Sequence, residues 1–226
     1  MNLKDKIIET GYDLFAEKGY DHTSVAEIIK VVGTSKGGFY HHFKSKEEIL
    51  ETITFRYIET IKLYYIEILE SDDLTIQEKF IESYYKLGEF KRKSLSQWPK
   101  LEKLYSFKGN HILLKRMGES FQEATDEFYI DLINRGVSQG VFNTKYPKQL
   151  ALLWSREVMQ FHRSVRQILF SNKGEYEEFY RLLEFNEDLI NNQLGLVENR
   201  IPIISCGKEY FDKMKQSAKD LGYIKE

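Results

Sequence analysis

The sequence is poor in several features that would otherwise point to particular classes of protein. It has a single cysteine, Cys206, so no internal disulfide can form, as is usual for proteins of the reducing cytoplasm. Only three prolines interrupt the 226 residues, at positions 99, 147 and 202, which favours long helices. No stretch of about 18 residues is apolar enough to span a bilayer, and the charged start MNLKDKIIETGYDLF has no signal-peptide core. We therefore expect a soluble, cytoplasmic protein with no membrane partner.

An excess of charge of one sign and most familiar catalytic signatures are also missing. Lysine and arginine total 33 against 35 aspartates and glutamates, a net charge of −2. This balance excludes a uniformly basic nucleic-acid coat but not a local basic patch. The patterns GxGxxG, GxxxxGK[ST] and HExxH do not occur, and Cys206 has no histidine nearby in the sequence. We therefore expect neither an enzyme nor a cofactor or metal site.

Apolar residues recur at helical spacing along the whole chain, and no run with strand periodicity has a useful length. The first fifty residues predict three short helices, over 3–18, 24–32 and about 35–43, with Ser24-x-x-Glu27 as a capping box. Longer helices are predicted over 46–70, 75–96, 99–117, 119–139, 147–170, 175–195 and 206–221. Only Ile201–Ile204 looks extended. The predicted fold is all-α, with a small N-terminal unit followed by a larger helical body.

The segment from Ser24 to Lys46 is locally basic. No acidic residue occurs between Glu27 and Glu47, whereas lysines stand at positions 30, 36, 44 and 46. Binding to nucleic-acid phosphates requires clustered positive charge of this kind. This segment is therefore the candidate DNA-binding surface.

A helical wheel divides the third short helix into two faces. Phe39 and Phe43, four residues apart, share the face that must be buried. The opposite face and its borders carry Lys36, Gly37, Gly38, Tyr40, His41 and His42. Two successive glycines in a helix cost on the order of 1 kcal/mol each relative to alanine. Close approach of this backbone to the floor of a DNA groove would compensate for that cost.

The N-terminal fifty residues resemble the DNA-binding domain of the TetR family of bacterial transcriptional regulators. The resemblance is carried by LFAEKGY at 14–20, TSVAEI at 23–28, GTSKG at 33–37 and FYHHFKSKEE at 39–48. It implies that one set of positions contacts operator phosphates: Ser24, Val25, Tyr40, His42 and Lys46. It implies that a second set faces base edges: Lys36, Gly37, Gly38 and His41. Because two of that second set are glycines, Lys36 is the clearest candidate for a direct base contact.

The same resemblance implies the layout of the remaining chain. Residues 1–48 would form a helix-turn-helix DNA-binding domain, and residues 49–226 a helical domain for effector binding and dimerisation. The long helices near 147–170 and 175–195 would form a homodimer that binds a palindromic double-stranded DNA operator. The implied function is a transcriptional repressor that a small, largely apolar effector releases from its operator.

Aromatic and polar-tipped side chains accumulate in the middle helices, as in pockets for largely apolar ligands. The candidate effector-binding residues are Tyr57, Ile61, Tyr64, Tyr84, Tyr105, His111, Phe121, Trp154 and His162. An aromatic stripe at helical spacing is more often part of an ordinary core. Two alternatives therefore remain open: a family member that acts through a protein partner without a small-molecule effector, or an activator.

Overall fold

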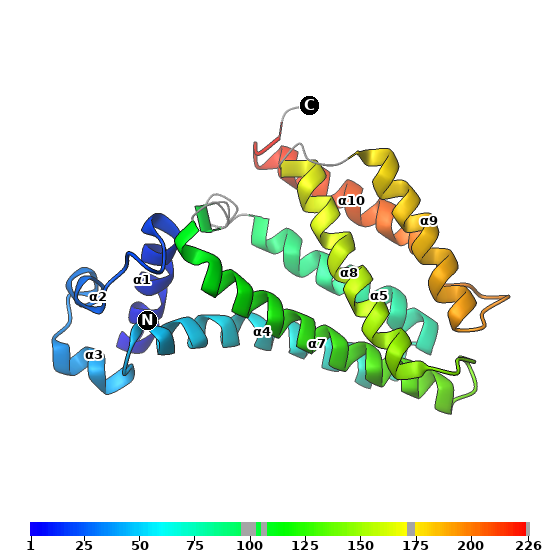
Figure 1. Ribbon diagram of the computed structural model, residues 1–226, viewed down its shortest axis with the longest axis horizontal. Helices are drawn as coiled ribbons and strands as arrows, with labels where there is room; N and C mark the ends of the chain where they lie inside the picture. The colour runs from blue at the N-terminus through cyan, green and yellow to red at the C-terminus, as the bar shows by residue number, and fades with distance from the viewer. Residues whose placement is uncertain (96–102, 105–107, 171–174, 225–226) are drawn as a thin grey trace. The chain divides into compact units, whose positions relative to one another are not determined.

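The computed structural model describes residues 1–95, 103–104, 108–170 and 175–224, and within these ranges the chain is helical and contains no strand (Figure 1). The elements are α1 (Leu3–Lys18), α2 (Val25–Val32), α3 (Lys36–His42), α4 (Lys46–Glu70), α5 (Ile76–Ser94), η2 (Lys108–Asn110), α7 (His111–Ser138), α8 (Pro147–Phe170), α9 (Tyr176–Gln193) and α10 (Ile203–Asp220). The all-α prediction is confirmed. None of these helices combines the length and the apolarity needed to cross a membrane.

Two predicted helix boundaries are wrong. The break expected near residue 118 does not exist, because α7 runs without interruption through Gly118; one interior glycine costs only about 1 kcal/mol relative to alanine. The last helix begins at Ile203 rather than at residue 206. Pro202 stands at its N-cap, and the first N–H groups of a helix need no acceptor within the helix, so two residues of the extended-looking segment join the first turn.

The chain divides into two compact units, each with its own interior. The first comprises residues 1–60 together with residues 97–121, and the second comprises residues 61–96 together with residues 122–226. The predicted DNA-binding domain of residues 1–48 lies wholly within the first unit. Helices α4 and α7 each contribute residues to both units.

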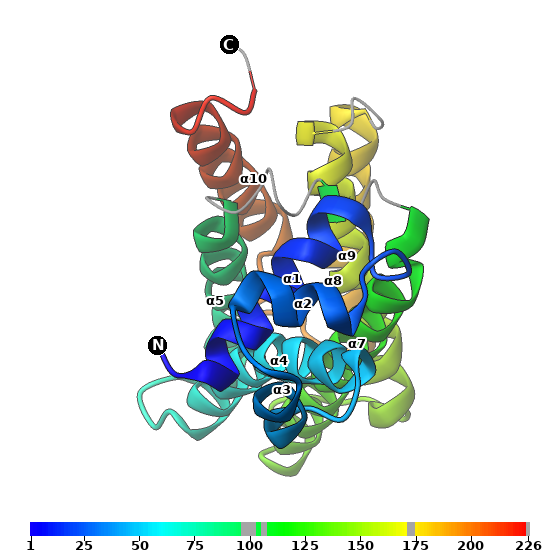
Figure 2. The same ribbon diagram turned by 90° about the vertical axis from the view of Figure 1, so that its left-hand side faces the viewer.

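In the first unit, the three short helices gather around the first turns of α4 (Figure 2). Apolar residues from every helix of this unit form the core: Ile7, Phe15, Ile28, Phe39, Phe43, Ile49, Leu104 and Leu113. Helix α1 passes very close to α4 at Gly11, where an added Cβ would lie 2.9 Å from the Ile49 Cγ2 atom. Two of the core leucines lie beyond residue 100, so the N-terminal helices do not complete this core by themselves.

In the second unit, α10 packs along α5 and α9, and α8 packs along α9. The aromatic centre of this unit is Trp154 on α8, whose ring centroid lies 5.6 Å from that of Phe80, 6.4 Å from that of Tyr84 and 6.5 Å from that of Tyr129. Trp154 is fully buried. Aromatic rings at these separations interact favourably beyond the burial of their area.

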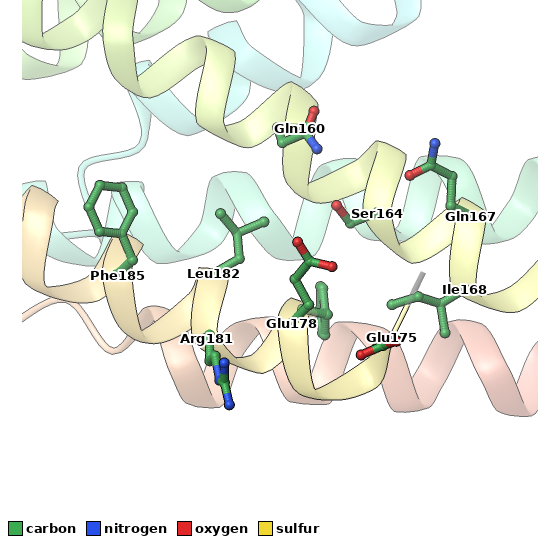
Figure 3. Close-up of a pocket in the computed structure, with 10 residues that line it drawn as sticks. Gln160, Ser164, Gln167, Ile168, Glu175, Glu178, Arg181, Leu182 and Phe185 are labelled. Atoms are coloured by element: carbon green, nitrogen blue, oxygen red, sulfur yellow. The ribbon is translucent and has the colours of Figure 1, made fainter. Parts of the chain in front are cut away.

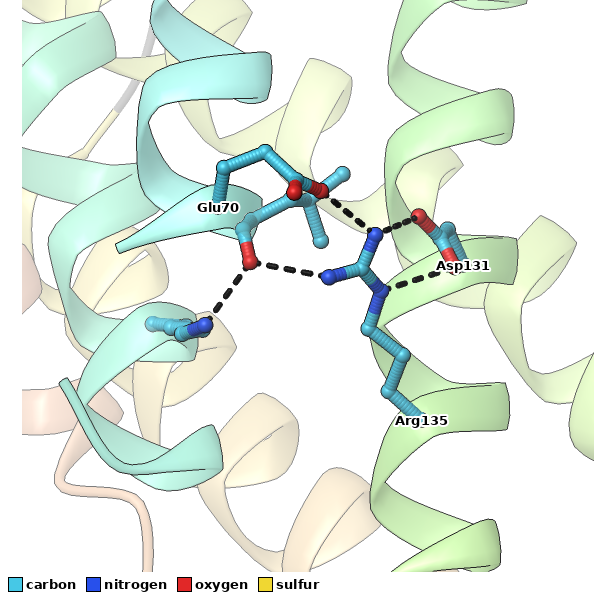
Figure 4. Close-up of polar contacts among 5 residues, drawn as sticks. Glu70, Asp131 and Arg135 are labelled. Atoms are coloured by element: carbon cyan, nitrogen blue, oxygen red, sulfur yellow. Dashed lines mark hydrogen bonds and ion pairs between the residues drawn. The ribbon is translucent and has the colours of Figure 1, made fainter. Parts of the chain in front are cut away.

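The C-terminal end of α4 is held by two basic side chains of the second unit (Figure 4). Arg135 donates to the Leu69 carbonyl at 2.9 Å and to Glu70 at 2.8 Å, and it also pairs with Asp131 on its own helix at 3.0 Å. Lys79 donates to the same Leu69 carbonyl at 2.8 Å. The last carbonyls of a helix lack partners within the helix and attract cations, so these side chains fix where α4 ends.

Candidate nucleic-acid interface

Helix α3 is a short helix with one buried and one exposed face. Ser35 caps its N-terminus, where the Oγ atom accepts a hydrogen bond from the Gly38 N–H at 3.0 Å. Phe39 and Phe43 are both buried in the core of the first unit, as the wheel predicted. Tyr40, the residue next to Phe39, is 55% exposed. The apolar side of α3 is therefore anchored in the core, and its polar, glycine-containing side faces outward.

Six of the predicted DNA-contacting residues lie on α3, and the other three lie at the starts of α2 and α4. The exposed members of the set are Ser24, Lys36, Gly37, Tyr40 and His41. The half-buried members are Val25, Gly38, His42 and Lys46. All of them belong to the first unit, so the structure brings the whole predicted set together in one compact body.

The two adjacent glycines of α3 have different surroundings. A Cβ on Gly38 would lie 2.5 Å from the Thr34 Oγ1 atom, so packing within the chain already favours glycine there. A Cβ on Gly37 would meet only the Ser35 Oγ atom, at 3.8 Å, which is ordinary contact. Nothing within the described part of this unit therefore demands glycine at 37. The predicted close approach to a DNA groove is therefore not needed to explain Gly38, and for Gly37 it stays a prediction.

The turn between α2 and α3 is tight because Gly33 adopts a left-handed conformation, with φ +73°. The N–H groups of Gly33 and Thr34 both donate to the Ile29 carbonyl, at 3.1 and 3.2 Å, which closes the end of α2 as helix C-caps with glycine do. At its other end Ser24 caps α2 by accepting from the Glu27 N–H at 3.2 Å. Only this half of the predicted capping box forms, because the Glu27 carboxylate pairs with Lys18.

Residues Gly33–Gly37 match the GxSxG pattern of hydrolase nucleophiles. A nucleophile elbow requires a strand before the serine. Here Ser35 instead follows helix α2, and its hydroxyl caps α3. The match is therefore explained by the turn between two helices. In the described ranges no group of three or more His, Cys, Asp or Glu side chains is placed to hold a metal ion.

The start of α4 is tied to the segment that follows α1. The Lys46 ammonium donates to the carbonyls of Tyr20 and Thr23, at 2.7 and 3.1 Å, and lies 4.3 Å from the centre of the Tyr20 ring. An ammonium group has three N–H donors, and these two carbonyls engage two of them.

Tyr20 is also bound through its side chain. Its hydroxyl donates to the Glu47 carboxylate at 2.7 Å. Burial, and then this hydrogen bond and the charge of Glu47, raise the pKa of Tyr20 above its usual value. The same hydrogen bond, followed by bonds from the backbone and from Ser45, lowers the pKa of Glu47. Near neutral pH the pair therefore stays in one protonation state, with Tyr20 neutral and Glu47 charged.

The candidate effector-binding residues are divided between the two units. Ile61, Tyr64, Tyr84, Trp154 and His162 belong to the second unit, and Tyr57, His111 and Phe121 to the first, while Tyr105 lies outside the described residues. His111 is exposed, and its Nδ1 atom lies 3.3 Å from the Lys108 carbonyl. Two grooves occur in the described part of the second unit, about 390 Å³ between α8 and α9 and about 530 Å³ between α5 and α10. None of the candidate residues lines either groove.

Tyr84, Trp154 and His162 nevertheless share one buried aromatic cluster. The Phe161 ring links them, with its centroid 5.4 Å from that of Tyr84 and 5.0 Å from that of His162. The His162 Nδ1 atom lies 3.3 Å from the Tyr210 hydroxyl, whereas its buried Nε2 atom has no hydrogen-bond partner among the described residues. Burial, together with the positive charge of Lys91, holds the pKa of His162 well below its usual value, so the ring is neutral near pH 7.

The geometry of the first unit is that of a known class of domain. A capped helix, a turn of a few residues and a second helix with an exposed face constitute a helix-turn-helix DNA-binding domain, and the chain continues into a larger helical body. Residues 7–53 match the family model described as "Bacterial regulatory proteins, tetR family". The N-terminal fifty residues are therefore similar to this family of bacterial regulatory proteins.

A named regulator is similar to part of the chain. The chain is 40% identical over 67 residues to the Staphylococcus epidermidis biofilm operon icaADBC HTH-type negative transcriptional regulator IcaR. The match covers 30% of this chain and 34% of that relative, so it spans about a third of the relative's length.

Solved structures share the fold over most of the chain. A putative TetR-family regulator from Syntrophomonas wolfei superposes with a TM-score of 0.58 at 24% identity, over 83% of this chain and 94% of that one. A SmeT–triclosan complex superposes with a TM-score of 0.53 at 16% identity, over 99% and 92%. At these identities the likeness concerns the fold alone.

Proposed function

We propose that this protein is a homodimeric transcriptional repressor that binds a palindromic DNA operator and is released from it by a small, largely apolar effector. The observation that carries the DNA-binding part is the exposed face of α3, with Lys36, Gly37, Tyr40 and His41, fixed by the burial of Phe39 on the other side of the helix. An anchored helix with a narrow, basic outer face suits insertion into a major groove. Repression fits the printed description of IcaR as a negative transcriptional regulator.

In this arrangement the predicted residues divide into two roles. Tyr40 and His42 on α3 and Lys46 at the start of α4 would contact phosphates, as would Ser24 and Val25 at the start of α2. Lys36 and His41 would face the bases, with Gly37 and Gly38 allowing the backbone to approach. Phosphate contacts set position and base contacts set sequence preference, so the two groups should respond differently to substitution.

The dimer part of the proposal is supported by the outer face of α8 and α9 (Figure 3). Gln160, Ser164 and Gln167 from α8 and Glu178, Leu182 and Phe185 from α9 line a groove of about 390 Å³ there. Phe185 is 58% exposed. Helices α8 and α9 pack side by side. The groove between them, with an exposed aromatic side chain beside it, forms a surface that a second copy can cover.

Several apolar residues of α8 and α9 are not available to a second copy. Trp154, Val158 and Phe161 on α8, and Leu183 and Ile190 on α9, are buried in the chain's own core. A helix that packs on one side needs an apolar stripe. These residues form that stripe and pack within the chain itself. The exposed apolar residues Leu153, Tyr176 and Phe185 are the ones that remain available to a second copy.

The effector part of the proposal is supported by the buried His162 ring. A buried polar atom without a partner costs about 1–3 kcal/mol, and a ligand with one hydrogen-bonding group could satisfy the Nε2 atom. The SmeT structure of the same fold holds triclosan. Release from DNA then requires that the ligand prefers the conformation that does not bind DNA.

Two substitutions test the DNA-binding face, one through affinity and the other through sequence preference. We expect Tyr40→Ala to weaken binding to every duplex by a similar factor, about tenfold for two half-sites, because it removes a phosphate contact. We expect Lys36→Ala to change which sequences are preferred, because a good base contact discriminates by about 1–3 kcal/mol. Selection from a random pool of duplexes, followed by fluorescence anisotropy with the selected operator, measures both effects.

A charge-matched control separates these effects from a general loss of positive charge. Lys62 is exposed on the second unit and pairs with Glu127 at 2.9 Å, so Lys62→Ala should leave both affinity and preference unchanged. Unchanged binding by Tyr40→Ala together with unchanged preference by Lys36→Ala would show that α3 does not enter the groove.

The effector proposal has its own test. A library of apolar compounds that each carry one hydrogen-bonding group should contain members that raise the melting temperature of the protein and weaken its operator binding by about 5–150-fold, the usual range of allosteric coupling. His162→Phe, which removes the polar atoms, should abolish the response to those compounds while operator binding without compound persists. A library that shifts neither quantity would favour the alternative in which a protein partner controls the regulator.

A further inference from the structure

Residues far along the chain complete the DNA-binding unit. Leu104 and Leu113 are fully buried in the same core as Phe15 and Phe39. Arg116, one turn further into α7, forms an ion pair with Glu51 of α4 at 3.1 Å. All of these residues belong to the first unit. The start of α7 is therefore an integral part of this unit, although almost sixty residues separate it from the end of the family match at residue 53.

Asn110, the residue before α7, makes the central polar contact of this attachment. Its Oδ1 atom accepts from the Tyr20 N–H at 2.9 Å, and its Nδ2 atom donates to the carbonyls of Phe15 and Leu104 at 3.0 and 3.2 Å. The side chain is fully buried. Its amide oxygen and both amide hydrogens are thus engaged with backbone groups, and a fully satisfied buried amide fixes the geometry of the groups it joins.

Tyr20 connects Asn110 to the first residues of α4. Its N–H is held by Asn110, its carbonyl accepts from Lys46, and its hydroxyl donates to Glu47. Lys46 is the predicted phosphate-contacting residue at the start of α4. One residue therefore connects the segment before α7 to the position of a side chain at the proposed DNA interface.

Resting on the proposed function, we infer that Asn110 is a positioning residue for operator binding. It holds Tyr20, and through Tyr20 it holds the Lys46 ammonium where its third N–H can meet a phosphate. Because α7 continues from Asn110 into residues of the second unit, α7 is, like α4, a helical connection through which the larger helical unit can change DNA affinity. Displacement of the start of α7 would withdraw Asn110 from Tyr20 and release Lys46.

The chain supplies a matched control for this inference. Asn191, on α9 in the second unit, is also fully buried. Like Asn110, its side chain binds one backbone N–H and two backbone carbonyls. Its Oδ1 atom accepts from the Ile201 N–H at 2.7 Å, and its Nδ2 atom donates to the carbonyls of Glu187 and Ile201 at 2.7 and 3.0 Å. Asn110→Asp and Asn191→Asp therefore remove the same two donors and add the same charge, one in each unit.

The experiment compares these variants on the operator selected by the wild-type protein. We expect Asn110→Asp to bind about tenfold more weakly and with a shallower salt dependence, since the phosphate contact of Lys46 is lost in each subunit. We expect Asn191→Asp to bind within about twofold of wild type once its dimer fraction has been matched by sedimentation. In a Lys46→Ala background, Asn110→Asp should add no more than about twofold, because both changes remove one contact.

Each other outcome has a defined meaning. A wild-type protein that selects no duplex overturns the proposed function, whereas a wild-type protein that binds while Asn110→Asp binds equally well overturns this inference alone. Equal losses for the two aspartate variants, or an undiminished loss in the Lys46→Ala background, would reduce Asn110 to a stability role.

A second measurement applies even when Asn110→Asp is unfolded at the assay temperature. In the wild-type protein, operator binding should slow hydrogen exchange at the Tyr20 amide, because linkage is reciprocal. An exchange rate there that is unchanged on operator binding would contradict the relay.

Discussion

Replacing Phe185 with glutamate should yield a folded monomer with little affinity for a two-half-site operator. Phe185 is more than half exposed on α9 beside the groove with α8, so the substitution removes no core contact. In a two-fold interface each change occurs twice, and two added like charges brought together without water cost several kcal/mol. Loss of the second half-site removes the avidity of the dimer, which is about 10²–10⁴-fold for linked sites.

Sedimentation velocity and operator anisotropy at several protein concentrations measure this result. Val197→Glu is the control, because Val197 is 89% exposed in the segment after α9 and lies outside the groove. It adds the same charge to the same unit, and it should leave the dimer and the affinity as they are. A Phe185→Glu protein that sediments as a dimer and binds its operator like wild type would show that this face does not join the two copies.

Replacing Trp154 with alanine should lower the free energy of unfolding by about 3–5 kcal/mol, the range for truncating a large buried aromatic residue. Trp154 is fully buried and contacts the rings of Phe80, Tyr84 and Tyr129. Truncation removes those contacts and leaves a cavity that rigid neighbouring helices cannot fill. Urea unfolding monitored by circular dichroism, at fixed protein concentration because the dimer contributes, gives the value.

The same measurement separates the two interpretations of the aromatic residues in the second unit. A side chain that lines an effector cavity has already lost part of its packing, and its removal should cost less than about 1 kcal/mol. Tyr146→Ala is the control, since Tyr146 is exposed just before α8 and its loss should stay within about 0.5 kcal/mol. A small effect for Trp154→Ala would therefore contradict its placement in the core and favour a cavity there.

The local features of the DNA-binding unit were predictable because short segments encode them. Ser24 and Ser35 cap helices within three residues of their partners, Gly33 closes a turn, and the spacing of Phe39 and Phe43 sets the buried face of α3. Each of these features depends on neighbours within about one helical turn. The capping box shows where such reasoning ends, because the Glu27 carboxylate pairs with Lys18, nine residues away in another helix.

The sequence by itself determined that the protein is helical, where most helices lie, and which short helix presents a basic face beside a tight turn. Only the tertiary structure decided that Leu104 and Leu113 complete the core of the DNA-binding unit and that Asn110 holds Tyr20. It also decided which apolar residues of α8 and α9 lie inside the chain's own core and which stay exposed. The physical reason is that capping and periodicity act between near neighbours, whereas burial and a hydrogen bond across ninety residues depend on which segments meet in space.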